Sequence, residues 1–177
     1  MTTLRHEPVM LHEAIDGLNV RPGGIYVDAT LGLGGHSEAM LEAAAPDGRV
    51  LGIDRDRDAL AAASERLAPF SDALTTVHGS FSEIAEICEQ SEFQSVDGVL
   101  FDLGVSSMQL DSPGRGFSFQ RDEPLDMRMD ATAGQTAADI VNEYEETDLA
   151  QLIWEFGEER RSRPIARAIV ARRPIQT

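Results

Sequence analysis

The fold is decided by residues 25–36, which read IYVDATLGLGGH. A short apolar run that ends in Asp28 is typical of a buried strand. Three glycines within the next seven residues predict a tight turn, because glycine adopts positive φ at little steric cost. The stretch from His36 to Ala45 then predicts a helix, whose first N–H groups lack partners within the helix. We therefore predict a strand, a glycine turn and a helix, arranged so that a ligand can approach the backbone.

A second acid, Asp54, follows the next predicted strand, Arg49 to Ile53. It lies about 20 residues after the glycine turn, the spacing of an acid that binds a ribose. A dinucleotide site would need glycine or alanine in place of Ser37, and it has no use for Asp28. S-adenosyl-L-methionine fits better, because the Asp28 carboxylate can hold its methionine ammonium directly or through water. The structural alternative is a glycine turn that binds nothing.

Length and composition limit the remaining possibilities. With 177 residues, 42% of them hydrophobic, the chain has room for one globular domain, or one domain and part of another. No apolar run approaches the roughly 20 residues of a membrane span, and the first residues lack the apolar core of a signal peptide. We therefore expect a cytoplasmic protein that binds no membrane. The single cysteine, Cys88, shares an apolar stripe with Ile84 and Ile87, which predicts a buried thiol and no metal site.

The charge of the chain is strongly acidic and unevenly distributed. All 15 basic residues are arginines, and 31 acids bring the net charge to −16, which disfavours nucleic acid. Residues 158–177 nevertheless contain six arginines. Phosphate contact explains this cluster, and so does a solvated helix face with i,i+4 pairs such as Glu159 and Arg163.

Strands and helices alternate over the first hundred residues. The expected strands and helices, in chain order, are Met10–Leu18 (helix), 25–28 (strand), His36–Ala45 (helix), Arg49–Ile53 (strand), Asp58–Leu67 (helix), Leu74–His78 (strand), a helix opened by a capping box at Ser80, and Val96–Leu103 (strand). This alternation predicts an α/β fold with a doubly wound parallel sheet, which binds ligands at the carboxyl ends of its strands. The residues expected at those ends are Asp28, Asp54, Ser80, Phe81 and Asp102.

No further strand is predicted after Leu103. Residues 104–130 form a long irregular stretch with interleaved aromatic residues, glycines and arginines, and loops of this length are usually functional or disordered. Three helical segments follow: one capped by Thr136, one from Thr147 to Phe156 that Gly157 ends, and residues 158–173 with a break at Pro164. We therefore divide the chain into residues 1–109, which contain the predicted strands and the nucleoside-cofactor pattern, and residues 110–177, which form a loop followed by helices.

Seven ordered motifs along the chain resemble one protein family. They are HEPVM at 6–10, DATLGLGGHS at 28–37, GIDRD at 52–56, DLGVSSMQLD at 102–111, RGFSF at 115–119, LDMRMD at 125–130 and GEER at 157–160. Together they resemble the bacterial 16S ribosomal RNA (cytosine-N4) methyltransferase family, RsmH or MraW. The resemblance implies a Rossmann-like methyltransferase fold and S-adenosylmethionine-dependent methylation of the N4 amino group of a cytidine in 16S rRNA of the small ribosomal subunit.

The resemblance also implies a set of cofactor-binding residues. These are Gly34, Gly35, His36, Asp54, Phe81, Asp102 and Gln109, to which the turn itself adds Asp28 and Gly32. Ser80, where the family usually has Asn, and Pro164 depart from the family pattern. The family sheet has seven strands with a helical insertion after the fourth, so the chain resembles an amino-terminal fragment without strands five to seven. The resemblance implies that residues 1–109 are the cofactor-binding methyltransferase domain with strands one to four, and that residues 110–177 are a loop and the first part of a truncated helical substrate-recognition insertion.

Chemistry assigns roles to the remaining candidates. A cytosine amino nitrogen is a poor nucleophile, and a hydrogen-bond acceptor beside it would localise its lone pair and take its proton. Asp102 is the candidate for this catalytic role, as is a carbonyl of the turn 103–106. The base must leave its stack, so Phe117 and Phe119 are candidate stacking platforms and Arg115 and Arg128 candidate phosphate partners. Packing or surface pairing is the alternative for each of these four.

Two other functional hypotheses remain at this point. A nicotinamide-dependent oxidoreductase would explain the glycine turn and Asp54, although not Asp28 or the motifs at 102–130. A cofactor-binding fragment without catalysis would use the same residues as the enzyme. In such a fragment the fourth strand would lie at an exposed sheet edge, so we also expect self-association through that strand.

Overall fold

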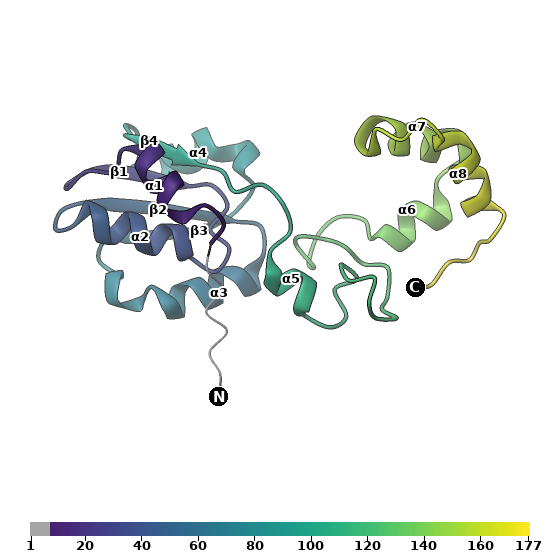
Figure 1. Ribbon diagram of the computed structural model, residues 1–177, viewed down its shortest axis with the longest axis horizontal. Coiled ribbons are helices and arrows are strands. Elements are labelled where there is room, and N and C mark those ends of the chain that lie inside the picture. Colours follow the sequence, from purple (N-terminus) through teal and green to yellow (C-terminus); the bar gives the residue numbers. More distant parts are fainter. Residues whose placement is uncertain (1–7) are drawn as a thin grey trace. The chain divides into compact units, whose positions relative to one another are not determined.

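A computed structural model describes residues 8–177, apart from the side chain of Ser107. His6 and Glu7, the first two residues of the motif at 6–10, lie outside the described residues. The chain folds as two compact units, of which the first ends at Ser106 and the second is Ser107–Thr177 (Figure 1). Each unit is described by itself below.

The first unit is built on a four-stranded parallel sheet. Its strands are β1 (Ile25–Asp28), β2 (Arg49–Asp54), β3 (Leu74–His78) and β4 (Gly98–Leu100). Their order is β3-β2-β1-β4, and the register places Tyr26 beside Val50 on one side and Gly98 on the other. The sheet confirms the predicted doubly wound α/β fold, and it places the fourth strand at an edge of the described sheet.

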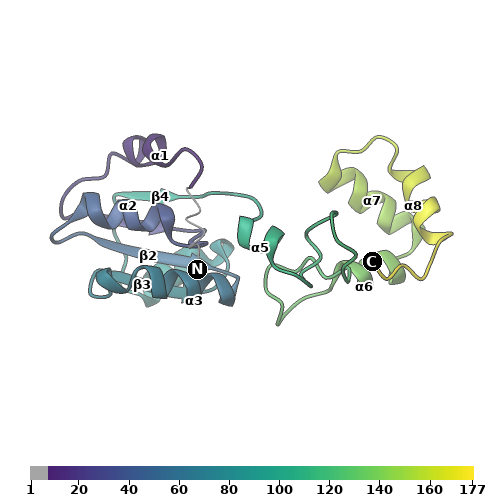
Figure 2. The same cartoon turned by 60° about the horizontal axis from the view of Figure 1, so that its bottom comes forward.

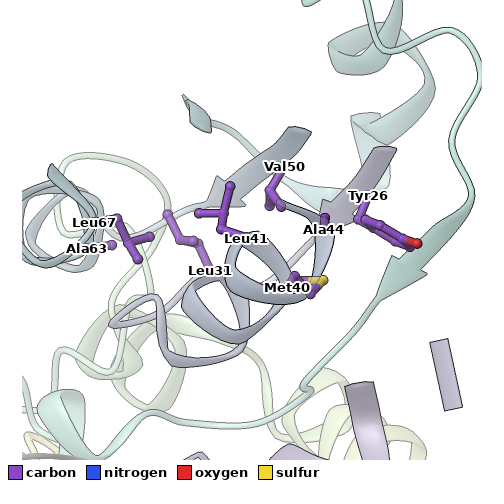
Figure 3. Close-up of a cluster of buried hydrophobic side chains, with 8 residues drawn as sticks. All are labelled: Tyr26, Leu31, Met40, Leu41, Ala44, Val50, Ala63 and Leu67. Atoms are coloured by element: carbon purple, nitrogen blue, oxygen red, sulfur yellow. The ribbon is translucent and has the colours of Figure 1, made fainter. Parts of the chain in front are cut away.

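Helices cover both faces of this sheet, as alternating side chains along the strands require. The first unit contains α1 (Leu11–Leu18), α2 (Gly35–Ala44), α3 (Arg57–Arg66), α4 (Ile84–Gln90) and the 3-10 turns Ala68–Phe70 and Phe81–Glu83. On one face Tyr26 and Val50 pack against Met40, Leu41 and Ala44 of α2 and Ala63 of α3 (Figure 3). The turn after β1 and the start of α2 are therefore anchored to the core.

The other face of the sheet packs against α4. Val27, Leu51 and Ile53 point to this face, alternating along the strands with Tyr26 and Val50, and they form a buried cluster with Ile87 of α4. Cys88 is partly buried beside this cluster, and burial raises the pKa of its thiol. The predicted role of Cys88 as a packing residue agrees with this position.

β4 is shorter than the predicted strand Val96–Leu103. It ends at Leu100, whose carbonyl accepts from the Ala29 N–H at 2.9 Å. The next pairing leaves the ladder, because the Asp102 N–H donates to the side chain of Thr30. In the part of the chain that the structure describes, β4 has β1 as its only neighbour, and Val99 and Leu103 are 37% and 70% exposed.

The second unit is helical. It contains α5 (Ser107–Asp111), α6 (Ala137–Glu143), α7 (Glu146–Gly157) and α8 (Ser162–Val170), and its core joins Leu149 and Ala150 of α7 to Ala166 of α8. The chain after α8 returns along α6 (Figure 2). There the Arg173 side chain donates to the Val141 carbonyl at 2.6 Å, and Asn142 pairs with the backbone of Ile175.

Several local predictions can be compared with these elements. The capping box predicted at Ser80 is confirmed, and it opens the 3-10 turn Phe81–Glu83 that leads into α4. Thr136 caps α6 as predicted, and α5 interrupts the stretch predicted to be irregular. The predicted helix Thr147–Phe156 is confirmed as α7 within one residue at each end, with one difference: Gly157 is its last helical residue, and Glu158 rather than Gly157 takes the left-handed cap position. Pro164 does not break a helix, since it lies in the first turn of α8, where its missing N–H costs nothing. Within residues 8–177, no helix has the length and apolar character that crossing a membrane requires.

Candidate functional site

Asp54 lies at the carboxyl end of β2 and faces the glycine turn that follows β1. Its Oδ2 accepts from the Gly32 N–H at 2.7 Å, and its Oδ1 accepts from the Asp56 N–H at 2.8 Å. Two backbone donors thus fix the carboxylate, and each oxygen keeps lone pairs for further donors. This geometry suits an acceptor for the hydroxyl groups of a ribose.

The glycine turn has the backbone conformation that its sequence predicts. Gly32 and Gly34 have φ of +52° and +77°, which side chains other than glycine rarely adopt. A Cβ on Gly34 would also lie 2.8 Å from a methyl group of Leu67, so this glycine is needed for packing against α3. Gly34 has no side chain to cap α2, so within the described residues the N-cap satisfies none of the N–H groups in the first turn of α2, which is the end of a helix that suits a polar ligand.

Asp28, at the end of β1, is buried beneath this turn. Its side chain accepts from the Thr30 N–H at 3.2 Å and from the Ser37 hydroxyl at 2.8 Å. Burial raises the pKa of Asp28 to about 6, although the hydrogen bonds from Ser37 and Thr30 oppose this shift. In the structure, Asp28 stabilises the turn through its hydrogen bonds with Thr30 and Ser37. Its contact with a methionine ammonium stays a prediction.

His36 and Asp102 lie together at the edge of a hollow of about 270 Å³. His36 Nδ1 is 3.9 Å from Asp102 Oδ2, which is an ion pair only when the imidazole is protonated, and Nε2 is 3.3 Å from the Val9 carbonyl. The volume of the hollow lies just below the roughly 300 to 1,000 Å³ of most ligand pockets. The residues that line it are Val9, Met10, Glu13, Ala14, His36, Leu100, Phe101 and Asp102.

Two aromatic rings meet near the carboxyl ends of the strands. Phe81, after β3, and Phe101, after β4, form an edge-to-face pair with centroids 5.8 Å apart and planes at 87°. Phe81 is 41% exposed and is available for the cofactor contact that the resemblance implies. Sequence reasoning missed Phe101, although its place directly before Asp102 indicated that it lies beside the site. Ser80 caps the turn here by accepting from the Ser82 N–H at 3.2 Å.

The other predicted site residues belong to the second unit. Gln109 lies in α5 with its side chain buried, and its role in the cofactor site stays a prediction. Phe119 is 97% exposed, whereas Phe117 lies under the Arg115 guanidinium, 5.9 Å from the ring centroid. The two candidate stacking rings therefore differ in how much surface they offer.

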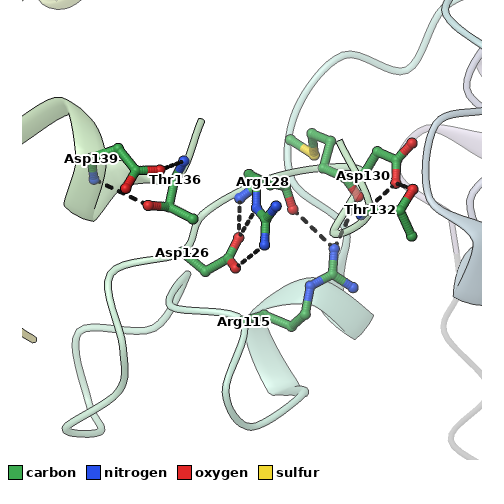
Figure 4. Close-up of polar contacts among 8 residues, drawn as sticks. Arg115, Asp126, Arg128, Asp130, Thr132, Thr136 and Asp139 are labelled. Carbon is green, nitrogen blue, oxygen red and sulfur yellow. Dashed lines mark hydrogen bonds and ion pairs between the residues drawn. The ribbon is translucent and has the colours of Figure 1, made fainter. Parts of the chain in front are cut away.

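Arg115 and Arg128 are both engaged within the second unit (Figure 4). Arg128 forms a two-pronged pair with Asp126, at 2.9 and 2.7 Å, which holds the pKa of the Asp126 carboxyl below its usual range. Arg115 donates to the carbonyls of Arg128 and Met129 at 3.1 and 3.0 Å. These contacts give both arginines a role in ordering the loop before α6, while their contact with phosphate stays a prediction.

The fold and these strand ends define a class of protein. A parallel sheet in the order β3-β2-β1-β4, with a glycine turn after β1 and an acid at the end of β2, is half of a Rossmann-like sheet that binds a nucleoside cofactor. The chain belongs to the MraW methylase family, whose sequence model matches residues 3–177.

Named relatives support this assignment. The chain is 52% identical, over its whole length, to ribosomal RNA small subunit methyltransferase H of Geotalea uraniireducens, and covers 58% of that protein. It is 55% identical over 95% of its length to the protein of the same name from Carboxydothermus hydrogenoformans, and covers 53% of it. The chain thus spans about half the length of the curated relatives it matches.

The match to solved structures is more partial. A SAM-dependent O-methyltransferase from Thermotoga maritima shares 19% identity with the chain, at a TM-score of 0.42. The aligned part covers 47% of this chain and 33% of that protein. The assignment therefore depends on the family match and on the geometry of the sheet.

Proposed function

We propose that this chain carries the cofactor half of an enzyme that methylates the N4 amino group of a cytidine in 16S rRNA, using S-adenosylmethionine. The observation that carries the proposal is the contact between the Asp54 carboxylate and the Gly32 N–H, at 2.7 Å. It brings the acid at the end of β2 against the turn after β1, and these are the two features by which such a fold binds a nucleoside cofactor. Family membership favours methyl transfer over the nicotinamide-dependent alternative.

The residues at the strand ends fit this cofactor. Asp54 would accept from the ribose hydroxyls, and the exposed ring of Phe81 would contact the adenine. The turn Gly32–His36 would hold the methionine end, with Gly34 and Gly35 offering backbone rather than side chains, and Asp28 and Gln109 complete the predicted set. When bound, the cofactor supplies a methyl group on a positively charged sulfur, so the protein has chiefly to align the acceptor nitrogen with that carbon.

Asp102 is the candidate for the proton transfer that methylation needs. The amino nitrogen gives up one proton when its bond to carbon forms, and a carboxylate beside it can first accept a hydrogen bond and then the proton. The Asp102 side chain is 55% exposed and lies beside His36, at the edge of the hollow. It is therefore accessible to a base and supported by the cofactor turn.

We further propose that the target cytidine lies in the small ribosomal subunit, which places the activity in the cytoplasm. The base must leave its stack before it can be methylated, and Phe119, which is 97% exposed, is the more accessible of the two candidate stacking rings. Phe117, Arg115 and Arg128 would then support this surface through the loop that they order.

Mass spectrometry of nucleosides from small-subunit rRNA tests this function. A strain without the gene should lack N4-methylated cytidine at one site, and the restored gene should bring it back. If the mark persists in the deletion strain, the substrate assignment is wrong. Cofactor binding without any change in the mark would instead support a binding protein without catalysis.

The cofactor site can be tested on the chain itself by replacing Asp54 with Ala. A lost charge-assisted hydrogen bond weakens binding by about tenfold or more, so Asp54→Ala should raise the Kd for S-adenosylhomocysteine by that factor in calorimetry. Asp47→Ala removes the same charge from an exposed position before β2 and should leave the Kd unchanged. Equal affinities in the two folded variants would remove Asp54 from the site.

A further inference from the structure

Asp102 is held by its backbone rather than by its carboxylate. Its N–H donates to Thr30 Oγ1 at 2.7 Å. Among the described residues, its carboxylate has only the 3.9 Å contact with His36. Where the Asp102 side chain lies is therefore decided chiefly by the hydrogen bond to Thr30.

This hydrogen bond replaces a rung of the sheet. The Ala29 N–H still pairs with the Leu100 carbonyl in the β1–β4 ladder, at 2.9 Å. After this pair the chain leaves β1 toward the glycine turn, and the described β1–β4 pairing ends at Asp28 and Leu100. The hydroxyl of Thr30 accepts the Asp102 N–H in place of a strand carbonyl, so a side chain continues the pairing for one more residue.

Thr30 is itself held in place from the core side. Its own N–H donates to the buried Asp28 carboxylate at 3.2 Å, and the same carboxylate accepts from Ser37 in the first turn of α2 at 2.8 Å. A continuous set of contacts thus runs from α2 through Asp28 and Thr30 to the backbone of Asp102. Its residues lie on the turn that would bind the cofactor and on the segment that would meet the substrate.

We propose that Thr30 is a positioning residue for methyl transfer: its hydroxyl fixes Asp102 relative to the cofactor turn. The catalytic part of this inference rests on the proposed function of Asp102. A misplaced group at a reacting centre costs up to about 100-fold in rate, so a loose Asp102 would slow the reaction far more than it would weaken cofactor binding.

Two variants separate the hydroxyl of Thr30 from its shape. Thr30→Val keeps the branched side chain and removes the acceptor, while Thr30→Ser keeps the acceptor and removes the methyl group. In the 177-residue chain, the Asp102 amide should exchange its hydrogen about tenfold faster in Thr30→Val than in the wild type. In Thr30→Ser it should exchange at the wild-type rate. An Asp102 amide that stays protected in folded Thr30→Val would overturn the proposal, whether or not the protein methylates RNA.

The second measurement concerns catalysis. In the deletion strain, the gene with Thr30→Val should restore much less of the N4-methyl mark than the gene with Thr30→Ser. S-adenosylhomocysteine should bind Thr30→Ser as it binds the wild type. Thr30→Val should lose much less of its affinity than of the mark, because only the contact of Asp102 with the cofactor is loosened while the contacts of Asp54 and of the glycine turn remain. Equal marks with a released Asp102 amide would refute the positioning role while leaving the proposed function intact. A mark that no version of the gene restores would count against the proposed function instead, and the amide measurement would still decide whether Thr30 holds Asp102.

Discussion

Replacing Asp28 with Asn should stabilise the first unit at neutral pH. The Asp28 side chain is 1% exposed, and burial raises its pKa from 3.8 to about 6. The hydrogen bonds from Ser37 and Thr30 favour the charged carboxylate, but they do not compensate for the hydration that the carboxylate loses on burial. Asn can keep both contacts, because its carbonyl accepts from the Thr30 N–H and the Ser37 hydroxyl can turn to accept from its amide.

The sign of the effect follows from proton binding. Between pH 3.8 and about 6 the folded chain binds the Asp28 proton more tightly than the unfolded chain, so the free energy of unfolding falls as the pH rises through this window. Above the window the loss from this one group amounts to roughly 3 kcal/mol. Asp28→Asn should therefore resemble the wild type below about pH 4 and exceed it by up to roughly 3 kcal/mol above about pH 7.

Urea unfolding of the wild type and of Asp28→Asn over this pH range measures the difference directly. Taking the difference cancels the other titrating groups, and Asp47→Asn, at an exposed site, should show no such trend. A stability difference that does not change with pH, or a less stable Asp28→Asn at neutral pH, would refute the reasoning. If Asp28 also holds the methionine ammonium, the same variant should bind S-adenosylhomocysteine more weakly while it unfolds less readily.

Two further outcomes are expected. Val99 is exposed on the edge strand β4, so the 177-residue chain should self-associate, as measured by light scattering. Val99→Lys should reduce this association, and a wild-type chain that stays monomeric would contradict the expectation. Arg128→Met removes the partner that keeps the pKa of Asp126 low, so amide exchange in the loop before α6 should become faster. In the wild type, amide exchange in that loop should become faster only as the pH falls below the ordinary pKa range of a carboxyl. Equal exchange rates for the loop in Arg128→Met and in the wild type at neutral pH would show that the pair is not needed.

Local signals were sufficient to predict much of the first unit. The strand Leu74–His78 has the predicted bounds, and the capping box at Ser80 forms as expected. In the second unit, Thr136 caps α6 as expected. In each case the interacting groups lie within a few residues of one another in the chain, so a local sequence pattern is enough to predict their contact. The glycine turn and its distance to Asp54 were predictable for a related reason, since both depend on backbone requirements that few residue types meet.

Contacts between distant segments were not predictable in this way. The pair of Phe81 and Phe101 depends on two chain segments that leave different strands and come together near the carboxyl ends. The bond from Asp102 to Thr30 depends on where the β1–β4 ladder ends. For Arg115 and Arg128, the sequence showed positive charge beside aromatic residues, which suits RNA as well as an internal partner. Only the fold shows that Asp126 and backbone carbonyls already accept from them.

The three acids at the strand ends look equivalent in the sequence and differ because of where their strands lie. β1 is an inner strand beneath a turn and a helix, so Asp28 is enclosed and its ionisation opposes folding. Asp54, also on an inner strand, reaches the turn and is fixed there by two N–H groups, which suits a stationary acceptor for a ligand. Asp102 follows an edge strand and keeps a side chain that is 55% exposed. A carboxylate that must take a proton from a substrate and pass it on to water needs this exposure, and it also needs another group to hold it in place. In the proposed mechanism the Thr30 hydroxyl would meet the second need without covering the carboxylate, because it accepts from the Asp102 backbone N–H.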